Sequence, residues 1–461
     1  MKNFLPKLGS KEIGALILSL GLLALGSFIA LFFLSWQYVL LINLVILLIL
    51  FLAKWPTVGL YAMILTYAFT NLQFRLEGYY FPVVDGIAVL LLIAVILKEV
   101  LACDFSFKKE KVCKILPGIV FAGLFWLAGF LSVLGSSDFL FSLKYWLRPM
   151  VFFYLAFVLL PFHLITGKKI FKRSIMLLTV GGAIMAVIGF VAVVLKQGPA
   201  WFIYRAVPFS VFGFNPIAGN HNAIAEVLVA TIPAVIMLFL WQKNYHRKGY
   251  LVMLAVFMSV VLFLTFSRSG WLVFLLQLLI LLFMKYRRRI DWSKAILFLV
   301  LFVVVGSAVY FLVWHGTSWV ESSDTNRIMM SEIALHRFFE KPALGHGPGL
   351  FQKLIGSAFV YWVEFSDALD SHGFVQKLLA ETGLFGLITF LAILFYIGRK
   401  FILAYQKTRK EKNKQIILAG FLIFLGVTVF QLFSTSYFTA VMWLPIGICL
   451  AGLKYYGKLK F

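Results

Sequence analysis

Apolar runs of about 20 residues recur along almost the whole 461-residue chain. A helix of that length spans the hydrocarbon core of a bilayer, where every backbone N–H and C=O must find a partner inside the protein. Helices and closed barrels meet that condition, and these runs lack the alternation of a transmembrane strand. Because 62% of the residues are hydrophobic and only 13% are charged, the sequence predicts an all-α polytopic membrane protein.

The apolar segments give fourteen candidate spans, so about 12–14 transmembrane helices are expected. We read the first as a retained span because no small-residue cleavage site follows it. The third and tenth are short enough to be tilted, half-buried or not spans at all. The fourteen segments cover residues 13–34, 38–53, 57–70, 81–97, 115–134, 149–165, 175–195, 223–241, 250–266, 271–284, 294–313, 373–397, 416–433 and 438–453.

Lysine and arginine follow these spans in a regular alternation. If the N-terminus is cytoplasmic, every second loop is basic, and all but 11 of the 42 Lys and Arg residues lie inside. Cytoplasmic loops of membrane proteins carry such an excess, so both ends are predicted to be cytoplasmic. The same rule accounts for the net charge of +24, and no nucleic-acid partner is expected.

Two loops on the outer side are long, at residues 196–222 and 314–372. We therefore divide the chain into N-terminal transmembrane helices, 1–195, and a core, 196–461, that includes the large extracytoplasmic loop 314–372. That loop is expected to be partly helical. Its helix is predicted to start after the capping-type residues at 324–326 and to stop at Pro342.

Arg268 lies in a short break between two spans, on the side where the orientation rule disfavours arginine. An arginine at such a depth is costly and usually has an anionic or carbonyl partner. Its planar fork suits phosphate oxygens, to which it can donate two hydrogen bonds without losing its charge. The structural alternative is an arginine that caps a helix end or reaches lipid headgroups.

Three further residues on the outer side could serve the same pocket. Arg205 lies in a loop rich in aromatic residues, glycine and proline, and Asn222 stands at the start of the eighth span, where helix capping is the simpler role. Arg327 is predicted to open the loop helix, where a cation meets the unfavourable end of the dipole. A partner is therefore expected, either an acid such as Glu332 or a ligand phosphate. Singly, each arginine is more often structural than functional.

His372 starts the twelfth span at the outer membrane boundary. Histidine is the side chain best poised near neutral pH to take a proton from a hydroxyl. Asp367 and Asp370 could orient the ring; a satisfied histidine at a helix N-terminus is the alternative. Glu381, deeper in the span, is expected to be a buried structural acid paired to another span.

His346 lies in "GHGPG", a glycine run that could form a backbone nest for phosphate or a plain turn. No spacing of His, Cys or acidic residues indicates a metal site, since Asp367 and Asp370 have no evident third ligand. Neither a metal nor a cofactor is predicted.

Taken in order, three motifs resemble one family. They are "SRSGWL" at 267–272, Arg327 followed by "PALGHGPGLF" at 342–351, and "SHGFVQKLLAETGLFG" at 371–386. The chain is similar here to the O-antigen ligase and polymerase superfamily of bacterial inner membranes, over roughly residues 200–400. The family commonly has asparagine directly after the histidine, whereas this chain has Gly373.

The resemblance implies an integral-membrane glycosyltransferase with a GT-C-like fold in the bacterial cytoplasmic (inner) membrane. Such enzymes move a glycan from an undecaprenyl-pyrophosphate carrier to a hydroxyl of a lipid, wall-polymer or protein acceptor, in the synthesis of cell-envelope polysaccharide such as lipopolysaccharide. The reaction is expected to be metal-independent and inverting. His372 and Arg268 would be catalytic, and the donor pyrophosphate and glycan would be bound by Arg205, Arg327, Asn222 and His346.

Ligase, repeat-unit polymerase and protein O-glycosyltransferase versions share these motifs and stay open. A different class, a polytopic transporter or a flippase for lipid-linked glycans, would predict internal repeats and ionisable residues near the bilayer midplane. The candidate residues gather instead at the outer boundary. A non-catalytic membrane scaffold gives no reason for outward arginines beside a loop histidine.

Overall fold

The computed structural model describes residues 35–76, 79–102, 117–199, 203–210, 214–217, 220–286, 318–365, 369–434 and 437–457. In these ranges, seven helices are long and apolar enough to cross a membrane. They are α2 (Trp36–Lys54), the continuous helix at 139–164, α8 (Lys168–Val194), α9 (His221–Trp241), α10 (Tyr245–Leu264), α16 (Phe374–Lys407) and α17 (Glu411–Phe430). The prediction of an all-α polytopic membrane protein is confirmed.

Shorter apolar helices complete the bundle in the described part of the chain: α3 (Pro56–Thr66), α5 (Ile119–Leu134), α11 (Arg268–Tyr286) and α18 (Ala440–Tyr456). Together with α4 (Val83–Ala102), these helices overlap twelve of the fourteen predicted spans. The other two, 13–34 and 294–313, lie outside the described residues. Periodicity and length thus located the helices, although several bounds differ by a turn or more.

The helix at 139–164 departs from regular geometry around a proline. It runs through α6 (Phe139–Tyr145), η1 (Trp146–Val151), η2 (Tyr154–Leu159) and α7 (Leu160–Leu164). Pro149 lies inside η1, where it cannot donate a backbone hydrogen bond, and the backbone widens there into a π-helix.

A small hairpin precedes α4. Strands β1 (Gln73–Leu76) and β2 (Tyr79–Pro82) pair antiparallel, with Phe74 opposite Phe81. The apolar segment predicted as a span from residue 81 therefore begins in a strand. Its aromatic residues suit a strand as well as a membrane helix, so hydrophobicity alone could not separate the two.

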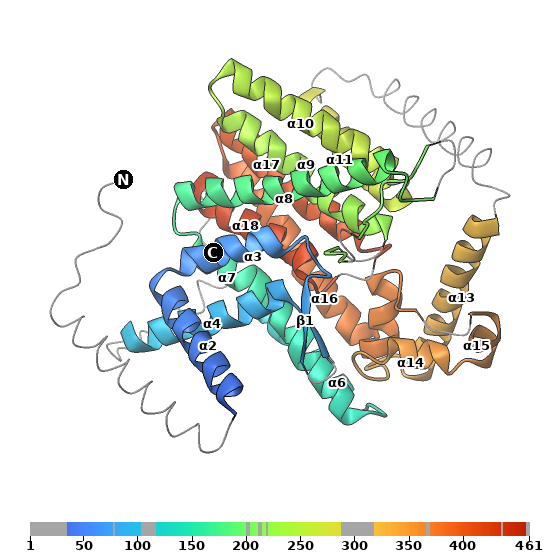
Figure 1. Cartoon of the computed structure of the whole chain (residues 1–461). Helices are drawn as coiled ribbons and strands as arrows, with labels where there is room; N and C mark the ends of the chain where they lie inside the picture. Colours follow the sequence, from blue (N-terminus) through green and yellow to red (C-terminus); the bar gives the residue numbers. More distant parts are fainter. Residues whose placement is uncertain are drawn as a thin grey trace.

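The core lies around α9 and α18. Helix α9 packs between α8 and α17, while α18 packs against α17, α7 and η2. Although α18 is short, its residues from Ala440 to Leu453 are all buried, and the Trp443 ring lies 4.5 Å from that of Phe153. Figure 1 shows α8, α9 and α10 running side by side across one part of the bundle.

The large loop contributes three helices that lie together beside the bundle, next to the start of α16 (Figure 1). These are α13 (Ser318–Glu340), α14 (Phe351–Gly356) and α15 (Phe359–Phe365). They share a small apolar core with Ala380 of α16. The predicted start of the loop helix was wrong, because α13 begins at Ser318. Arg327 consequently lies inside the helix and not at its positive end.

Packing explains the longer helix. Asn326, predicted to precede the helix, accepts a hydrogen bond of 3.1 Å from the Tyr361 hydroxyl of α15. Its side chain is therefore held by a tertiary contact. Capping preferences are worth only about 1 kcal/mol, so a tertiary packing arrangement readily overrides them.

Helix α16 is interrupted at Gly383, whose φ of +64° no helical residue adopts. The loop at 342–350 packs into this break. The Leu384 N–H donates to Pro342 O at 2.8 Å, and the His346 N–H donates to Ala380 O at 3.0 Å. A Cβ atom on Gly383 would lie 2.4 Å from Ala343 O, so this contact requires glycine.

Candidate active site

The turn between α10 and α11 is pinned to the start of α9. The Ser267 hydroxyl donates to Asn222 Oδ1 at 2.7 Å and accepts from the Gly270 N–H at 3.2 Å. Phe266 adopts a left-handed φ of 51°, which is rare for a residue with a bulky side chain. The "FSRSG" turn is therefore a constrained structure that carries Arg268 as the first residue of α11.

Arg205 is bound to the carbonyl end of α10. Its Nε donates to Thr265 O at 3.0 Å, and one terminal nitrogen donates to Phe266 O at 3.1 Å. A cation is favoured at that end of a helix, so Arg205 has the structural role that the sequence left open. Burial and the nearby charge of Arg268 lower the pKa of Arg205.

Three arginines act on one histidine. The charges of Arg205, Arg327 and Arg268 all reach the imidazole of His221, at the start of α9. Arg327 comes from α13 and also acts on His372. The structure thus brings the three predicted arginines together from three separate segments, and the side chains are half-buried. We call Arg205, Arg268, Arg327 and His221 the arginine cluster.

His372 lies in the turn that leads into α16, two residues before the helix starts at Phe374. Sequence analysis expected it on the helix itself. Burial and the charge of Arg327 lower the pKa of His372, while Asp370 raises it. The net shift of this pKa is downward from 6.5, which favours the neutral imidazole, the form that can accept a proton.

The turn that carries His372 is closely packed. The Ser371 hydroxyl donates to Gly373 O at 2.5 Å, and the Gly373 N–H donates back to that hydroxyl at 3.2 Å. A Cβ atom on Gly373 would lie 2.5 Å from Leu432 O. This explains in steric terms why the chain has glycine where the similar family commonly has asparagine.

Asp370 does not contact the ring as proposed from sequence. Its two carboxylate oxygens accept from Lys377 Nζ at 2.7 and 2.8 Å, and one of them also accepts from the Ser371 N–H at 2.8 Å. Asp367 lies outside the described residues. Glu381 is buried as expected, and accepts from the Phe351 N–H at 3.0 Å.

His346 belongs to a different set of contacts. Its Nε2 lies 2.9 Å from Arg337 O and 3.4 Å from a carboxylate oxygen of Glu340, at the end of α13. The N–H groups of His346 and Gly347 donate to carbonyls of α16. The "GHGPG" segment therefore acts as a turn that joins α13 to α16, and His346 is not among the residues that act on His221 or His372.

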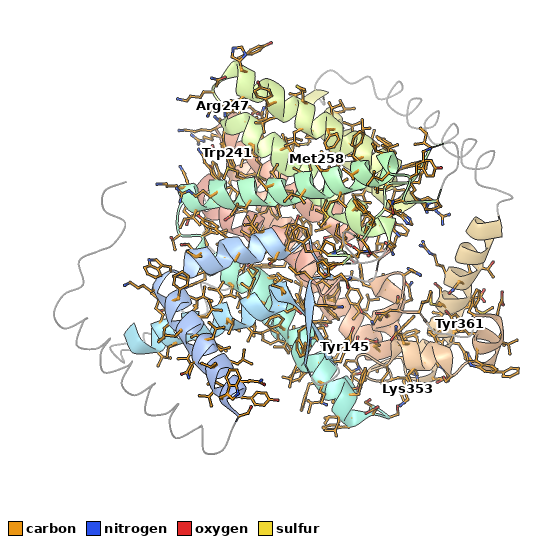
Figure 2. The ribbon with its side chains drawn as sticks, viewed as in Figure 1. Tyr145, Trp241, Arg247, Met258, Lys353 and Tyr361 are labelled. Atoms are coloured by element: carbon orange, nitrogen blue, oxygen red, sulfur yellow. The ribbon has the colours of Figure 1, made fainter. Side chains whose placement is uncertain are left out.

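Sequence analysis missed two residues of this region. His221 was not named as a site residue, although a histidine between two asparagines at the start of a span was a visible signal. Lys377 was counted as a basic residue on the outer side, and its position one turn beyond Gly373 gave no sign of the contacts it makes. Figure 2 places Tyr145, which lies under Lys377, in the same part of the molecule as Lys353 and Tyr361. Among the described residues, no group of three His, Cys, Asp or Glu side chains could hold a metal ion.

Residues 253–391 match the family model described as O-antigen ligase. The match runs from within α10 to the first half of α16, so it includes Arg268, Arg327, His346 and His372 but not Arg205 or Asn222. A comparison with curated proteins found no match. The resemblance that three short motifs suggested is confirmed.

Proposed function

Because residues 253–391 match the family model described as O-antigen ligase, we propose that this integral-membrane protein transfers a glycan from undecaprenyl pyrophosphate to an acceptor hydroxyl. The transfer takes place on the outer side of the cytoplasmic membrane, as glycan ligation or repeat-unit polymerisation. Residues 1–195 then supply membrane helices, and residues 196–461 form the catalytic core with its extracytoplasmic loop. Both ends of the chain are cytoplasmic in this proposal.

The arginine cluster is the observation that carries the proposal. Like charges that act on one another in a half-buried site oppose folding, because the surrounding dielectric is lower than in water. A diphosphate relieves that repulsion and offers the oxygen pairs that guanidinium groups bind best. A lipid-linked diphosphate also brings its own leaving group to a side of the membrane where nucleotide sugars are absent.

The reaction follows from the chemistry of the residues. The neutral imidazole of His372 takes the proton of the acceptor hydroxyl while that oxygen attacks the anomeric carbon from the face opposite the carrier. The bond between this carbon and the phosphate oxygen breaks, and the electron pair stays on the diphosphate. Arg268 and Arg327 stabilise the charge that develops there, as fixed dipoles and charges commonly do in catalysis. The sugar is inverted, and His372 later releases its proton to water.

Donor binding should strengthen the base. The charge of Arg327 is one reason why the pKa of His372 is low. A diphosphate bound beside Arg327 offsets that charge and raises the pKa of His372 in the complex. The imidazole is then a better base when the donor is present, which favours transfer over idle proton exchange.

The test uses the purified full-length protein, a lipid-pyrophosphate oligosaccharide and a panel of candidate acceptor lipids, glycans and peptides. We expect wild-type protein to yield a transfer product and His372→Ala to lose at least about 100-fold in rate, the usual contribution of a general base. His336→Ala is the matched control, because that histidine is 80% exposed on α13. Full activity in His372→Ala would overturn the proposed mechanism.

The pH dependence gives a second measurement on the same material. His372 acts in its unprotonated form, so kcat/KM should be constant above the pKa of the free enzyme and fall as pH falls through it. Because this pKa is lowered from 6.5, the acid limb is expected below pH 6.5. A limb above that value would contradict the role given to Arg327.

A further inference from the structure

A second charged cluster lies beside the arginine cluster, along the first turns of α16. Lys377 Nζ is 2.7 and 2.8 Å from the two carboxylate oxygens of Asp370 and 3.9 Å from a carboxylate oxygen of Glu381. The lysine side chain is only 4% exposed and that of Glu381 1%, whereas Asp370 is 35% exposed. We call these three residues the lysine cluster.

The lysine cluster joins three parts of the fold. The Lys377 ammonium lies over the rings of Tyr145 from α6 and Tyr437 from the segment between α17 and α18, at 5.3 and 5.8 Å. Glu381 accepts a hydrogen bond of 3.0 Å from the N–H group of Phe351, at the start of α14. At its outer end, Asp370 accepts from the Ser371 N–H.

Stability alone is a weak reason to keep such a cluster. Replacing a buried ion pair with well-packed apolar residues is often neutral or stabilising, because the desolvation of both charges is costly. What a buried pair does supply is a defined geometry. Here that geometry fixes a carboxylate two residues from His372 and next to the tight turn of Ser371 and Gly373.

We propose that Lys377 is a positioning residue for His372: by holding both oxygens of Asp370, it fixes the turn that carries the imidazole and limits the negative charge that the imidazole meets. This rests on the proposed role of His372 as the base. Without the lysine, Asp370 would be free to turn, and its full charge would act on the ring. Without Asp370, the ring would meet the charge of Arg327 alone.

The charges of Arg327 and Asp370 act on His372 directly, and further titratable groups surround Lys377, the partner of Asp370. Arg327 approaches from α13 and Asp370 from the turn itself. Lys377 and Glu381 follow on α16, with Tyr145 of α6 and Tyr437 packed against the lysine. Removing Asp370 is therefore expected to lower the pKa of His372, whereas removing Lys377 is expected to raise it.

The decisive experiment measures the pKa of His372 without any substrate. Exchange of the imidazole C2 hydrogen for deuterium, followed by mass spectrometry across a pH series, reports this value for single histidines in the full-length protein in detergent. We expect Asp370→Asn to lower the pKa of His372 and Lys377→Met to raise it. The double variant Asp370→Asn/Lys377→Met should match Asp370→Asn, because the lysine acts through the aspartate.

Controls separate this outcome from a loss of folding. The C2 exchange of His336 should be the same in every variant. Lys377→Arg should restore the wild-type value for His372, since a guanidinium can hold both oxygens of Asp370. If Lys377→Met does not fold, Asp370→Asn and Lys377→Arg still decide the matter, because Asp370 is partly exposed. An unchanged His372 in Asp370→Asn, or shifts of the same sign in both single variants, would overturn the proposal.

Turnover then separates this proposal from the function on which it rests. In glycan transfer, Lys377→Met and Asp370→Asn should lower kcat more than they change KM, and move the acid limb of kcat/KM in the directions of the exchange data. If His372→Ala keeps its activity, the proposed function fails, whatever the exchange shows. If transfer depends on His372 but its pKa does not respond to either variant, only the role of Lys377 fails.

Discussion

The arginine cluster and the lysine cluster lie at the same end of the bundle, yet their charges are arranged differently: the first gathers like charges and the second pairs opposite ones. In the arginine cluster, positive charges from the turn after α10, from α13 and from the loop before α9 all act on His221, and Arg268 also acts on Arg205. In the lysine cluster, the ammonium of Lys377 meets two carboxylates within 3.9 Å. The second arrangement places opposite charges in direct contact.

We interpret this difference as a ligand-binding role for the arginine cluster and a structural role for the lysine cluster. The arginine side chains are half-buried, whereas Lys377 is buried beneath the rings of Tyr145 and Tyr437. A group of positive charges is stabilised when an anion binds, because the anion reduces their mutual repulsion. A closed ion-pair network is not stabilised further by a ligand, and it is destabilised if one of its members is removed. His372 lies where the two meet, under the influence of Arg327 on one side and Asp370 on the other.

The largest effect is expected from breaking the lysine cluster. Lys377→Met leaves a buried carboxylate without its cation, and removing one partner of a buried pair costs about 3–5 kcal/mol. Thermal unfolding of purified protein in detergent would measure this. Lys353→Met is the control, since Lys353 is 65% exposed and its nitrogen lies 3.7 Å from Asp138. Equal stability of the two variants would remove the contrast between the clusters.

Arg268→Lys tests the arginine cluster through its effect on the rate of glycan transfer. A lysine keeps the charge but not the fork, so transfer should fall about 100-fold, equivalent to about 2.7 kcal/mol. The unfolding temperature should change little, because lysine keeps the positive charge at position 268. Wild-type turnover would indicate that Arg268 is held at the membrane boundary for orientation alone.

Inorganic pyrophosphate should stabilise the wild-type protein through the arginine cluster. At a concentration ten times Kd, binding to the folded state alone contributes about 1.4 kcal/mol, seen as a higher unfolding temperature. The gain should shrink as salt is added, because charges at a half-exposed site are screened. It should be absent in Arg327→Gln and present in Lys353→Met. A gain that survives in Arg327→Gln would place the anion elsewhere.

The smallest effect is expected at the turn that supports the arginines. Ser267→Ala removes the 2.7 Å hydrogen bond to Asn222, and a single hydrogen bond is worth about 1 kcal/mol. Stability should fall by that amount, while pyrophosphate affinity falls because Arg268 is less well held. Ser331→Ala is the control: its hydroxyl bonds only to Arg327 O within its own helix, so pyrophosphate binding should be unchanged.

Much of the fold was predictable from residue order. Apolar runs located twelve helices, since burial of a long apolar segment in lipid leaves few alternatives. The hairpin before α4 and the early start of α13 were not predictable. Both depend on what the segment packs against, as the contact between Asn326 and Tyr361 shows, and capping preferences are too weak to decide such a case.

For the site, sequence reasoning selected residues well but could not assign them to one pocket. Arg268 stood out by the orientation rule, Arg205 by its loop and Arg327 by its expected place at a helix start, and in the structure the charges of all three act on His221. His346 stood out by its glycines, but it lies in the turn after α13 and contacts the last residues of that helix. Asp370 was expected to hold the histidine ring and instead holds Lys377.

By itself the sequence determined that the chain is a helical membrane protein and which side chains could carry transfer chemistry, because hydrophobic length and charge placement are local properties. Only the tertiary structure decided which of these side chains share a neighbourhood. Positive charges gather around His221, and Lys377 is buried with its two acids. Contacts between distant residues hold this arrangement, such as the hydrogen bond from Ser132 to Glu381, 249 positions apart. Electrostatic interactions depend on distance in space, which a linear pattern does not contain.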